Sequence, residues 1–262
     1  MNKSDKHWEK YGKEDPYYWV TTLDKYHGQM NDEEKLKQFF QEGEEYGDKI
    51  FQIIRNRLSP DFAPKRILDY GCGVGRIIIP MAKNCESAVG TDISSTMLEK
   101  AQLHCDEMEL NHVKLVQSDD ALSKVEGTFD FIHSIYVFQH IPIERGLKIF
   151  KRMLGKLNPG GVAMLQFTYC SDMPKGREFL NWVKMNIPLA LQINNLLHLR
   201  APDAPMMEMH RYPLNRIERI LHEFEKAHTY VRFTKDGNYR GVMLFIQLDK
   251  SDDKYVDLPP IP

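Results

Sequence analysis

The sequence lacks the features that mark several special classes of protein. No apolar stretch reaches the roughly 20 residues that cross a bilayer, and the first residues, MNKSDKHWEK, have no apolar core of the signal-peptide kind. No two of the four cysteines have C-x-x-C spacing; they are Cys72, Cys85, Cys105 and Cys170. This spacing suggests neither a zinc site nor a disulfide framework. We therefore expect a cytoplasmic protein with no integral membrane segment and no metal.

A marked excess of charge is also missing. The formal net charge is −2, the isoelectric point lies near 6.6, and no basic stretch stands out. Bulk electrostatics therefore give no reason to expect nucleic acid as a partner. Repeats and low-complexity segments are absent, and the 42% of hydrophobic residues is ordinary for a globular protein. A chain of 262 residues is long enough to bury a sizeable core.

The first 60 residues are expected to form an arm and a helix that belong to the main domain. Residues 1–30 are polar but rich in aromatics, whereas disordered segments usually have few. These aromatics are Trp8, Tyr11, Tyr17, Tyr18, Trp19 and Tyr26. The arm is therefore expected to dock, either as a lid over a cofactor or by simple packing. Residues 31–59 carry an apolar helical stripe that ends at Ser59-Pro60.

From Arg66 the sequence alternates between short apolar runs and stretches of helical length. The runs are 66–70, 87–91, 113–117, 129–135 and 162–169, and the predicted helices are 75–84, 94–106 and 143–157. This alternation predicts an α/β fold with a parallel sheet that helices cover on both faces. Asn158-Pro159-Gly160-Gly161 is expected to separate the last helix from the fifth strand. Two β-rich runs around residues 235–238 predict a closing hairpin.

Residues 171–212 are expected to form an insertion between the two parts of the core, 61–170 and 213–250, and a tail of residues 251–262 follows. The insertion contains an amphipathic stretch, 179–199, that is expected to cap the active site, and a helix is expected near 213–226. A dimer contact and a membrane-surface patch stay open for the amphipathic stretch. Its potential cations are few: Lys184, His198 and Arg200.

The stretch ILDYGCGVGR places glycines at 71, 73 and 75 directly after the first apolar run. A strand that leads through a glycine turn into a helix forms a cradle that a ligand can approach closely. The spacing is G-x-G-x-G, whereas the dinucleotide fingerprint is G-x-G-x-x-G. Asp69 precedes the turn, where a carboxylate is poorly placed for a pyrophosphate and well placed for an amino group.

Acidic residues also end the next two predicted strands. Asp92 ends SAVGTD, and a carboxylate there can accept hydrogen bonds from both hydroxyls of a ribose. Asp119 and Asp120 follow VKLVQS at the end of the third run. Because ligands bind at the carboxyl ends of strands in open α/β sheets, we expect these carboxylates at one edge.

These motifs together resemble the class I S-adenosylmethionine-dependent methyltransferases. ILDYGCGVGR, VGTDIS and VQSDDA are similar to the first three motifs of that family, and FDFIHSIYVFQHIP and LGKLNPGGVAMLQF to the next two. The resemblance covers about residues 64–170. It implies a Rossmann-like seven-stranded, mostly parallel sheet with an antiparallel last strand, and S-adenosyl-L-methionine as cofactor.

The resemblance assigns a set of residues to the cofactor: Asp69, Gly71, Gly73, Gly75, Asp92, Ile93, Asp119, Asp120 and His133. It places Asp69 and the backbone of His133 near the methionine ammonium, and Asp92 on the ribose hydroxyls. It places Ile93 on the adenine face and Asp119 at the adenine amino group, where Asp120 would add its backbone amide.

Candidate catalytic and substrate residues are harder to assign. His140 in VFQHIP lies where the family often has a histidine near the reacting methyl, and imidazole is a natural general base near neutral pH. A capping or packing role for His140 stays open. In MEMHRYP, Glu208, His210, Arg211 and Tyr212 form a polar cluster that suits substrate recognition or a solvated linker. His210 is the second catalytic candidate, and Tyr136 is a further substrate candidate.

We therefore expect a methyltransferase that acts on a small molecule, either a metabolite, a sugar or a lipid-like compound. A homodimer is the protein partner considered. The alternatives are a non-catalytic binding or scaffold protein that keeps the cofactor fold, and a nicotinamide-dependent oxidoreductase. HSIYVF stands where methyltransferases of nucleobase or glutamine amino groups carry an Asn-Pro-Pro-Tyr-type motif, which argues against those acceptors.

Overall fold

A seven-stranded sheet organises the protein, which we describe from a computed structural model. The structure describes residues 3–28, 30, 32–199, 201–202, 204, 206–224 and 227–249. The predicted tail 251–262 lies outside them. The strand order is β3-β2-β1-β4-β5-β7-β6, and the strands are β1 (Arg66–Tyr70), β2 (Ser87–Asp92), β3 (Val113–Gln117), β4 (Phe129–Ser134), β5 (Leu157–Ser171), β6 (Ala227–Asp236) and β7 (Tyr239–Leu248).

The strand directions match the prediction from the sequence. Strands β1 to β5 pair in parallel, and β7 is antiparallel to both of its neighbours, β5 and β6. The β6–β7 hairpin turns at Gly237 and Asn238, within the predicted residues 235–238. The mostly parallel sheet with an antiparallel last strand is therefore confirmed.

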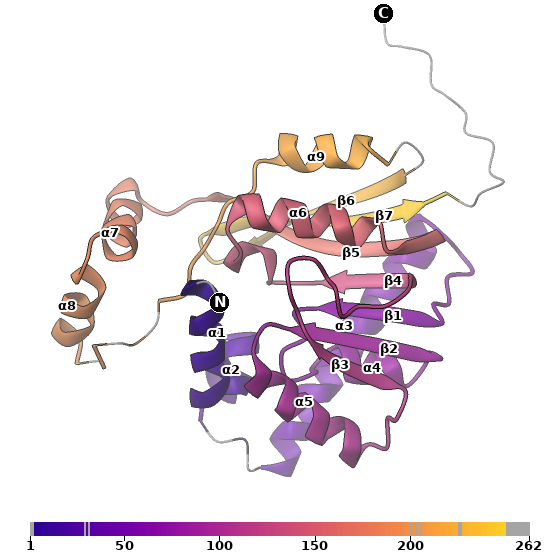
Figure 1. Ribbon diagram of the computed structural model, residues 1–262, viewed down its shortest axis with the longest axis horizontal. Coiled ribbons are helices and arrows are strands. Elements are labelled where there is room, and N and C mark those ends of the chain that lie inside the picture. The colour runs from indigo at the N-terminus through magenta and orange to yellow at the C-terminus, as the bar shows by residue number, and fades with distance from the viewer. Residues whose placement is uncertain are drawn as a thin grey trace, which may run out of the picture.

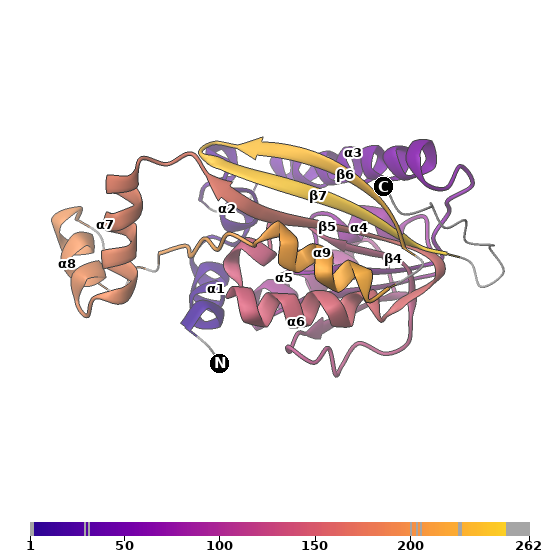
Figure 2. The same ribbon diagram turned by 90° about the horizontal axis from the view of Figure 1, so that it is seen from above.

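Helices cover both faces of the sheet (Figure 2). One face packs against α3 (Glu33–Arg57), α4 (Ile78–Ala82) and α5 (Ser95–Glu107), and the other against α6 (Ile143–Leu154) and α9 (Leu214–His222). Side-chain caps set two of the helix starts. The Asp32 carboxylate accepts hydrogen bonds from the backbone N–H groups of Glu34 and Lys35, and the Ser94 hydroxyl accepts one from Met97.

The strand β5 starts earlier than the sequence predicts. Asn158-Pro159-Gly160-Gly161 lies inside β5 and not before it, because the pairing with β4 is shifted between Phe129 and Phe131. Gly160 has a positive φ of 77° in this irregular part of the ladder. Residues 158–161 thus form a bulge in β5, and regular pairing with β4 resumes at Val162.

The N-terminal arm is part of the core domain. It contains α1 (Lys3–Glu14), α2 (Pro16–Thr21) and a short 3-10 helix, η1 (Asp24–Tyr26). Tyr11 and Tyr26 are each only 1% exposed, and the Tyr26 ring meets the edge of Phe39 at 5.1 Å. Figure 1 shows α1 and α2 at the carboxyl edge of the sheet, beside α5.

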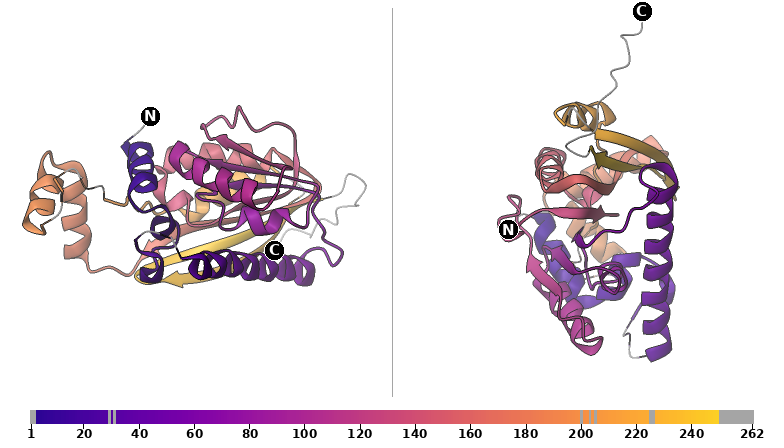
Figure 3. Two further views of the ribbon diagram at one scale, coloured as in Figure 1. Left: turned by 90° about the horizontal axis from the view of Figure 1, so that it is seen from below. Right: turned by 90° about the vertical axis from the view of Figure 1, so that its right-hand side faces the viewer.

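The inserted segment differs from the predicted cap. It forms two helices, α7 (Lys175–Asn186) and α8 (Ala190–Leu197), because Pro188 interrupts the chain between them and Leu189 has a φ of 62°. We call residues 175–197 the α7–α8 hairpin. Figures 1 and 3 show that it stands apart from the sheet, beyond the carboxyl edge. In the described part of the chain, no helix is long and apolar enough to cross a membrane.

Helix α3 and the glycine turn approach each other closely at Gly43, which gives a test of the fold. A Cβ at position 43 would lie 1.9 Å from the backbone oxygen of Arg76. Gly43→Ala should therefore lower the free energy of unfolding by about 1–3 kcal/mol, although alanine favours helix. Urea denaturation followed by circular dichroism measures the change.

Gly176→Ala in α7 is the matched control, because nothing lies within 4 Å of a Cβ at that position. This variant should be as stable as the wild type or slightly more stable. If Gly43→Ala behaved like Gly176→Ala, the close approach of α3 to the turn would be refuted.

Candidate functional site

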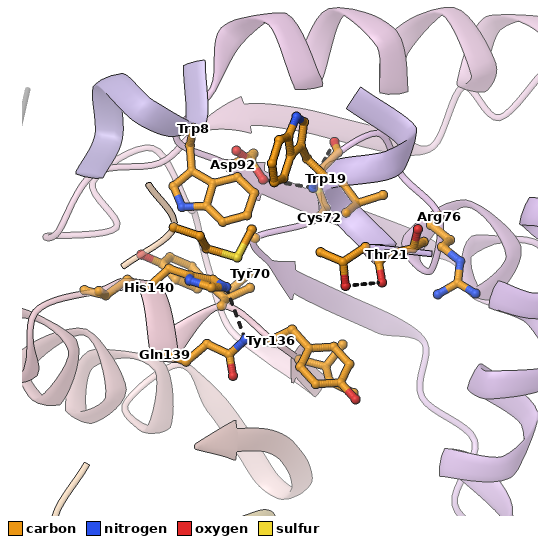
Figure 4. A pocket seen from close by; sticks show the side chains of 18 of the residues that line it. Trp8, Trp19, Thr21, Tyr70, Cys72, Arg76, Asp92, Tyr136, Gln139 and His140 are labelled. Carbon is orange, nitrogen blue, oxygen red and sulfur yellow. Dashed lines mark hydrogen bonds between the residues drawn. The ribbon is translucent and has the colours of Figure 1, made fainter. Parts of the chain in front are cut away.

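A cavity of about 840 Å³ lies at the carboxyl ends of β1, β2 and β4. Its wall combines the glycine turn after β1, the end of β2, the segment after β4, the β6–β7 turn and the N-terminal arm. Figure 4 shows Trp8, Trp19 and Asp92 on one side of this space, with His140, Gln139 and Tyr136 opposite them. The cavity has the size of a typical site for a cofactor or small ligand.

The glycine turn brings bare backbone to the cavity wall. Gly71 has a φ of 80°, and a Cβ there would lie 2.3 Å from Val137. Gly73 has a φ of 54°, and a Cβ there would lie 2.6 Å from Val20 of the arm. Gly75 has a φ of 87° but faces Ile79 and does not line the cavity. Gly71 and Gly73 thus line the cavity in backbone conformations that favour glycine, and Gly75 serves the turn behind them.

Asp92 ties the glycine turn to the start of α5. Its carboxylate accepts one hydrogen bond from the backbone N–H of Gly73 and one from that of Ser94, each 2.9 Å long. Burial raises the pKa of Asp92 to about 6, although the two backbone hydrogen bonds act in the opposite direction. Asp92 and Ile93 both line the cavity. Each carboxylate oxygen has a further lone pair, so Asp92 can still accept hydrogen bonds from a ligand.

Asp69, His133 and Tyr46 form a hydrogen-bonded chain on the cavity wall. The distance from Asp69 Oδ1 to His133 Nδ1 is 2.7 Å, and from His133 Nε2 to the Tyr46 hydroxyl it is 3.0 Å. A carboxylate only accepts, so Nδ1 carries the proton, and Nε2 then accepts from Tyr46. Burial beside Asp69 raises the pKa of Tyr46 well above its usual value. The sequence contains no local signal for Tyr46, which comes from α3.

His140 lines the cavity, but protein groups occupy both of its ring nitrogens. Nδ1 donates to the backbone oxygen of Glu208 at 2.7 Å, and Nε2 accepts from the Gln139 amide at 3.2 Å. The Thr168 hydroxyl donates to the other end of that amide. Burial lowers the pKa of His140 to about 4. His140 is therefore neutral and a weak base, which favours the packing role over general-base catalysis.

The two acidic residues after β3 do not line the cavity. The Asp119 carboxylate accepts hydrogen bonds from the Ser123 backbone N–H and hydroxyl, which lower its pKa. Asp120 lies 2.6 Å from Arg145 Nε. Ser118 and Arg145 line the wall instead. Because the backbone turns directly after β3, the residue before the acidic pair faces the cavity.

The segment 206–212 presents residues to the cavity that its sequence motif does not single out. Met207 and Met209 line the cavity, whereas Glu208 and His210 do not, and His210 Nε2 lies 3.4 Å from the Glu208 carboxylate. Adjacent side chains of an extended segment point to opposite sides, and a linker sequence does not reveal which set faces inward. The two candidate side chains are thus oriented toward each other and not toward the cavity.

The other three substrate candidates occupy different environments. Tyr212 is fully buried, and its hydroxyl donates to the backbone oxygen of Ile141 at 2.8 Å, so it is a core residue. Arg211 pairs with Glu178 of α7 at 2.6 Å and lies off the wall. Tyr136 lines the cavity and is 46% exposed. Of the substrate candidates, only Tyr136 reaches the cavity. No residue of the α7–α8 hairpin lines it.

The N-terminal arm closes one side of the cavity. The Trp8 ring lies 5.0 Å from the His140 ring, and the Ser4 hydroxyl donates to the His140 backbone oxygen at 2.8 Å. Arg145 Nη1 lies 2.6 Å from the Asp5 carboxylate. The sequence left two roles open for the arm, a lid and simple packing. The arm both lines the cavity and packs as part of the core.

The low pKa of His140 predicts a pH-dependent stability. In the unfolded chain this imidazole takes up a proton below about pH 6.5, whereas in the folded protein its pKa is about 4. Its contribution to stability is thus complete above pH 6.5 and is lost as the pH falls toward 4, by about 3 kcal/mol. Urea denaturation of His140→Gln and wild type at several pH values in this window isolates the effect. The difference in unfolding free energy should shrink as the pH falls. A constant difference would contradict the buried neutral histidine.

A family model described as a methyltransferase domain matches residues 40–224. Among curated relatives, the ubiquinone biosynthesis O-methyltransferase of Chelativorans sp. (strain BNC1) is 34% identical over 107 residues, which are 40% of this chain and 41% of that protein. The protein of the same name from Coxiella burnetii (strain Dugway 5J108-111) is 29% identical over 97 residues, or 37% and 41% of the two chains. The chain thus matches about two fifths of the length of these relatives.

Solved structures share the fold at low sequence identity. Magnesium protoporphyrin IX methyltransferase from Synechocystis PCC 6803, with bound SAH, has a TM-score of 0.60 and 18% identity, over 94% of this chain and 98% of that one. An S-adenosylmethionine-dependent methyltransferase from Clostridium acetobutylicum has a TM-score of 0.53 and 14% identity, over 78% and 90% of the two chains.

Proposed function

The chain belongs to the methyltransferase domain family, whose model matches residues 40–224, and from this membership we propose that it transfers a methyl group from S-adenosylmethionine to a small-molecule acceptor. The observation that carries the proposal is the shared cavity wall of Gly71, Gly73, Asp92 and Ile93. All four belong to the predicted cofactor set: the two glycines provide backbone without a side chain, and Asp92 provides a carboxylate that can accept hydrogen bonds.

The residues on the wall fit the proposed cofactor. Gly71 and Gly73 both line the cavity, and their positive φ angles, together with Val137 and Val20 packed against them, leave no room for a larger residue at either position. Asp92 has lone pairs left for the ribose hydroxyls, and Ile93 offers an apolar surface to the adenine. Asp69 provides a carboxylate near the methionine ammonium. When bound, the cofactor supplies a methyl group on a positively charged sulfur.

The remaining wall favours an apolar or aromatic acceptor. Side chains of aromatic, thioether and aliphatic type predominate there: Trp19, Tyr136, Ile141, Met207, Met209 and Met243. Such a surface suits a planar or lipid-like compound better than a sugar. Two curated relatives carry the name O-methyltransferase, which supports oxygen as the methylated atom. We therefore take a hydroxyl or carboxyl oxygen of an apolar small molecule as the acceptor.

The protein's own residues contribute chiefly by positioning and by excluding water. The arm covers the cavity through Trp8, and the Arg145–Asp5 pair holds it there. Where an acceptor hydroxyl must lose its proton, we propose that the Tyr46 oxygen takes it and that Tyr46 passes its own proton to His133 Nε2, since Tyr46 lines the cavity and bonds with that nitrogen. The imidazolium that results is stabilised by Asp69. The hydrogen-bonded series Tyr46–His133–Asp69 therefore replaces His140 as the proposed route for the proton.

A cytoplasmic location is part of the same proposal. It is supported by the four free cysteines, of which Cys72 and Cys105 are buried.

Incubation of the full chain with S-adenosylmethionine and a panel of phenols, catechols and aromatic carboxylic acids tests the activity. Release of S-adenosylhomocysteine with at least one class of acceptor is expected. Calorimetric titration with S-adenosylmethionine and with NAD tests the cofactor itself. Binding of NAD without binding of S-adenosylmethionine would overturn the proposal in favour of an oxidoreductase, and binding without turnover on any acceptor would favour a binding protein.

Asp92 should dominate the cofactor affinity. Asp92→Ala should weaken binding of S-adenosylmethionine by about 1.5–3 kcal/mol, because a charged acceptor is removed. The affinity of the wild type should also fall as the pH drops through about 6, since the pKa of Asp92 lies there and only the ionised form accepts both hydroxyls. Calorimetry between pH 5 and pH 8 measures both effects.

Asp119→Ala is the matched control for Asp92. Its carboxylate holds Ser123 and lies off the wall, so the affinity for the cofactor should stay within about twofold of wild type. Asp92→Asn keeps one carbonyl acceptor and serves as a second variant in case Asp92→Ala does not fold. Equal losses in Asp92→Ala and Asp119→Ala would restore the adenine role that the resemblance gave to Asp119.

The arm should contribute to cofactor retention through Trp8. Trp8→Ala should weaken cofactor binding by about tenfold, because the ring forms part of the wall. Deletion of residues 1–28 should in addition lower the melting temperature, since Tyr11 and Tyr26 are buried. Fluorimetric melting and calorimetry separate the two effects. Unchanged affinity in Trp8→Ala would limit the arm to packing.

A further inference from the structure

The α7–α8 hairpin exposes large apolar side chains that the fold leaves uncovered. Phe179 is 63% exposed, Trp182 54% and Leu197 78%. Exposed large apolar residues continue along both helices and their flanks: Leu180, Ile187, Leu189, Ile193, Leu196 and Leu199. The Phe179 and Trp182 rings are stacked, with centroids 6.2 Å apart and planes at 16°. So many exposed large apolar side chains on one hairpin normally mark an interaction site.

The position of the hairpin relates it to the cavity. Figures 1 and 3 show it beyond the carboxyl edge of the sheet, on the side where the arm lies, and the cavity lies at the same edge. It leaves the core after β5 and returns through the segment that contains Met207 and Met209, which line the cavity. A binding partner that covers the hairpin would thus lie at the same edge of the protein as the cavity.

The charge of the hairpin limits the choice of partner. Within the described residues, no ion pair is found for Lys175, Arg177 or Lys184. The acidic Glu178 is already bound to Arg211 outside the hairpin. The hairpin therefore carries surplus positive charge, although the whole chain has a formal net charge of −2. Anionic groups complement this surface, whereas a second hairpin placed face to face would bring like charges together.

From these observations we propose that the α7–α8 hairpin docks the protein on an anionic lipid bilayer. Phe179, Trp182 and the leucines enter the boundary between headgroups and acyl chains, and Lys175, Arg177 and Lys184 lie against the headgroups. This mode of binding needs apolar side chains and a few cations on a short amphipathic element, and it needs no membrane-spanning helix. It does not depend on the proposed methyl transfer.

Sedimentation of the full chain with lipid vesicles tests the proposal. The wild type should sediment with vesicles of phosphatidylcholine mixed with phosphatidylglycerol, and less with vesicles of phosphatidylcholine alone. The double variant Phe179→Ser and Trp182→Ser should bind the mixed vesicles at least about tenfold more weakly. The double variant Lys175→Gln and Lys184→Gln should lose the preference for phosphatidylglycerol.

Phe233→Ser is the matched control, since Phe233 is 64% exposed on β6, outside the hairpin. It should bind the vesicles as the wild type does. Calorimetry with S-adenosylmethionine should give unchanged affinity for all of these variants, because none of the changed residues lines the cavity. A failure of the cofactor proposal and a failure of the docking proposal are therefore distinguishable.

Two results would overturn the proposal. The first is a wild type that sediments with neither vesicle, or hairpin variants that bind as well as the wild type. The second comes from light scattering on the same samples: a wild-type dimer that Phe179→Ser and Trp182→Ser convert to a monomer, without any vesicle binding. That result would assign the hairpin to contact between two copies of the chain.

Discussion

Two hydrogen bonds to the Asp92 carboxylate connect the parts of the structure on which the site depends. One comes from the glycine turn at Gly73 and the other from Ser94, whose hydroxyl in turn caps α5. The turn after β1, the end of β2 and the start of α5 are therefore held as one unit. The raised pKa of Asp92 shows that burial makes its charge unfavourable. A partly buried carboxylate with a raised pKa at the mouth of a sheet is typical of a binding site.

The sequence was informative where structure is local. Apolar runs of five to seven residues, most of them followed by a stretch of helical length, were sufficient to predict β1 to β4. The same pattern predicted that Gly71, Gly73 and Asp92 lie together at the carboxyl edge of the sheet. The structure of the inserted segment could not be predicted in this way. Its amphipathic pattern does not reveal whether the apolar side faces the protein or leaves it, because both arrangements have the same periodicity.

The details of the site depend on side-chain directions and on distant partners. Asp119 and Ser118 are adjacent in the sequence, yet only Ser118 lines the cavity, because the backbone turns between the strand and the loop. His133 and His140 illustrate the second limit. His133 has a carboxylate on one nitrogen and a phenol on the other, whereas His140 has a carbonyl oxygen and an amide. Residues far away in the sequence supply several of these groups, so the motif around each histidine did not predict its chemical role.

The contacts of the arm with residues after β4 also affect the order in which the protein can assemble. Ser4 and Asp5, at the start of the chain, bond with His140 and Arg145, which the ribosome makes much later. Helix α1 also packs on α5, where the Glu9 carboxylate accepts hydrogen bonds from Ser95 and Thr96, but its contacts with His140 and Arg145 need β4 and the beginning of α6. Such non-local contacts form late because closing the long intervening loop is entropically costly. The wall of the cavity consequently depends on contacts between segments 136 and 140 residues apart in the sequence, so the site exists only when the domain has folded as a whole.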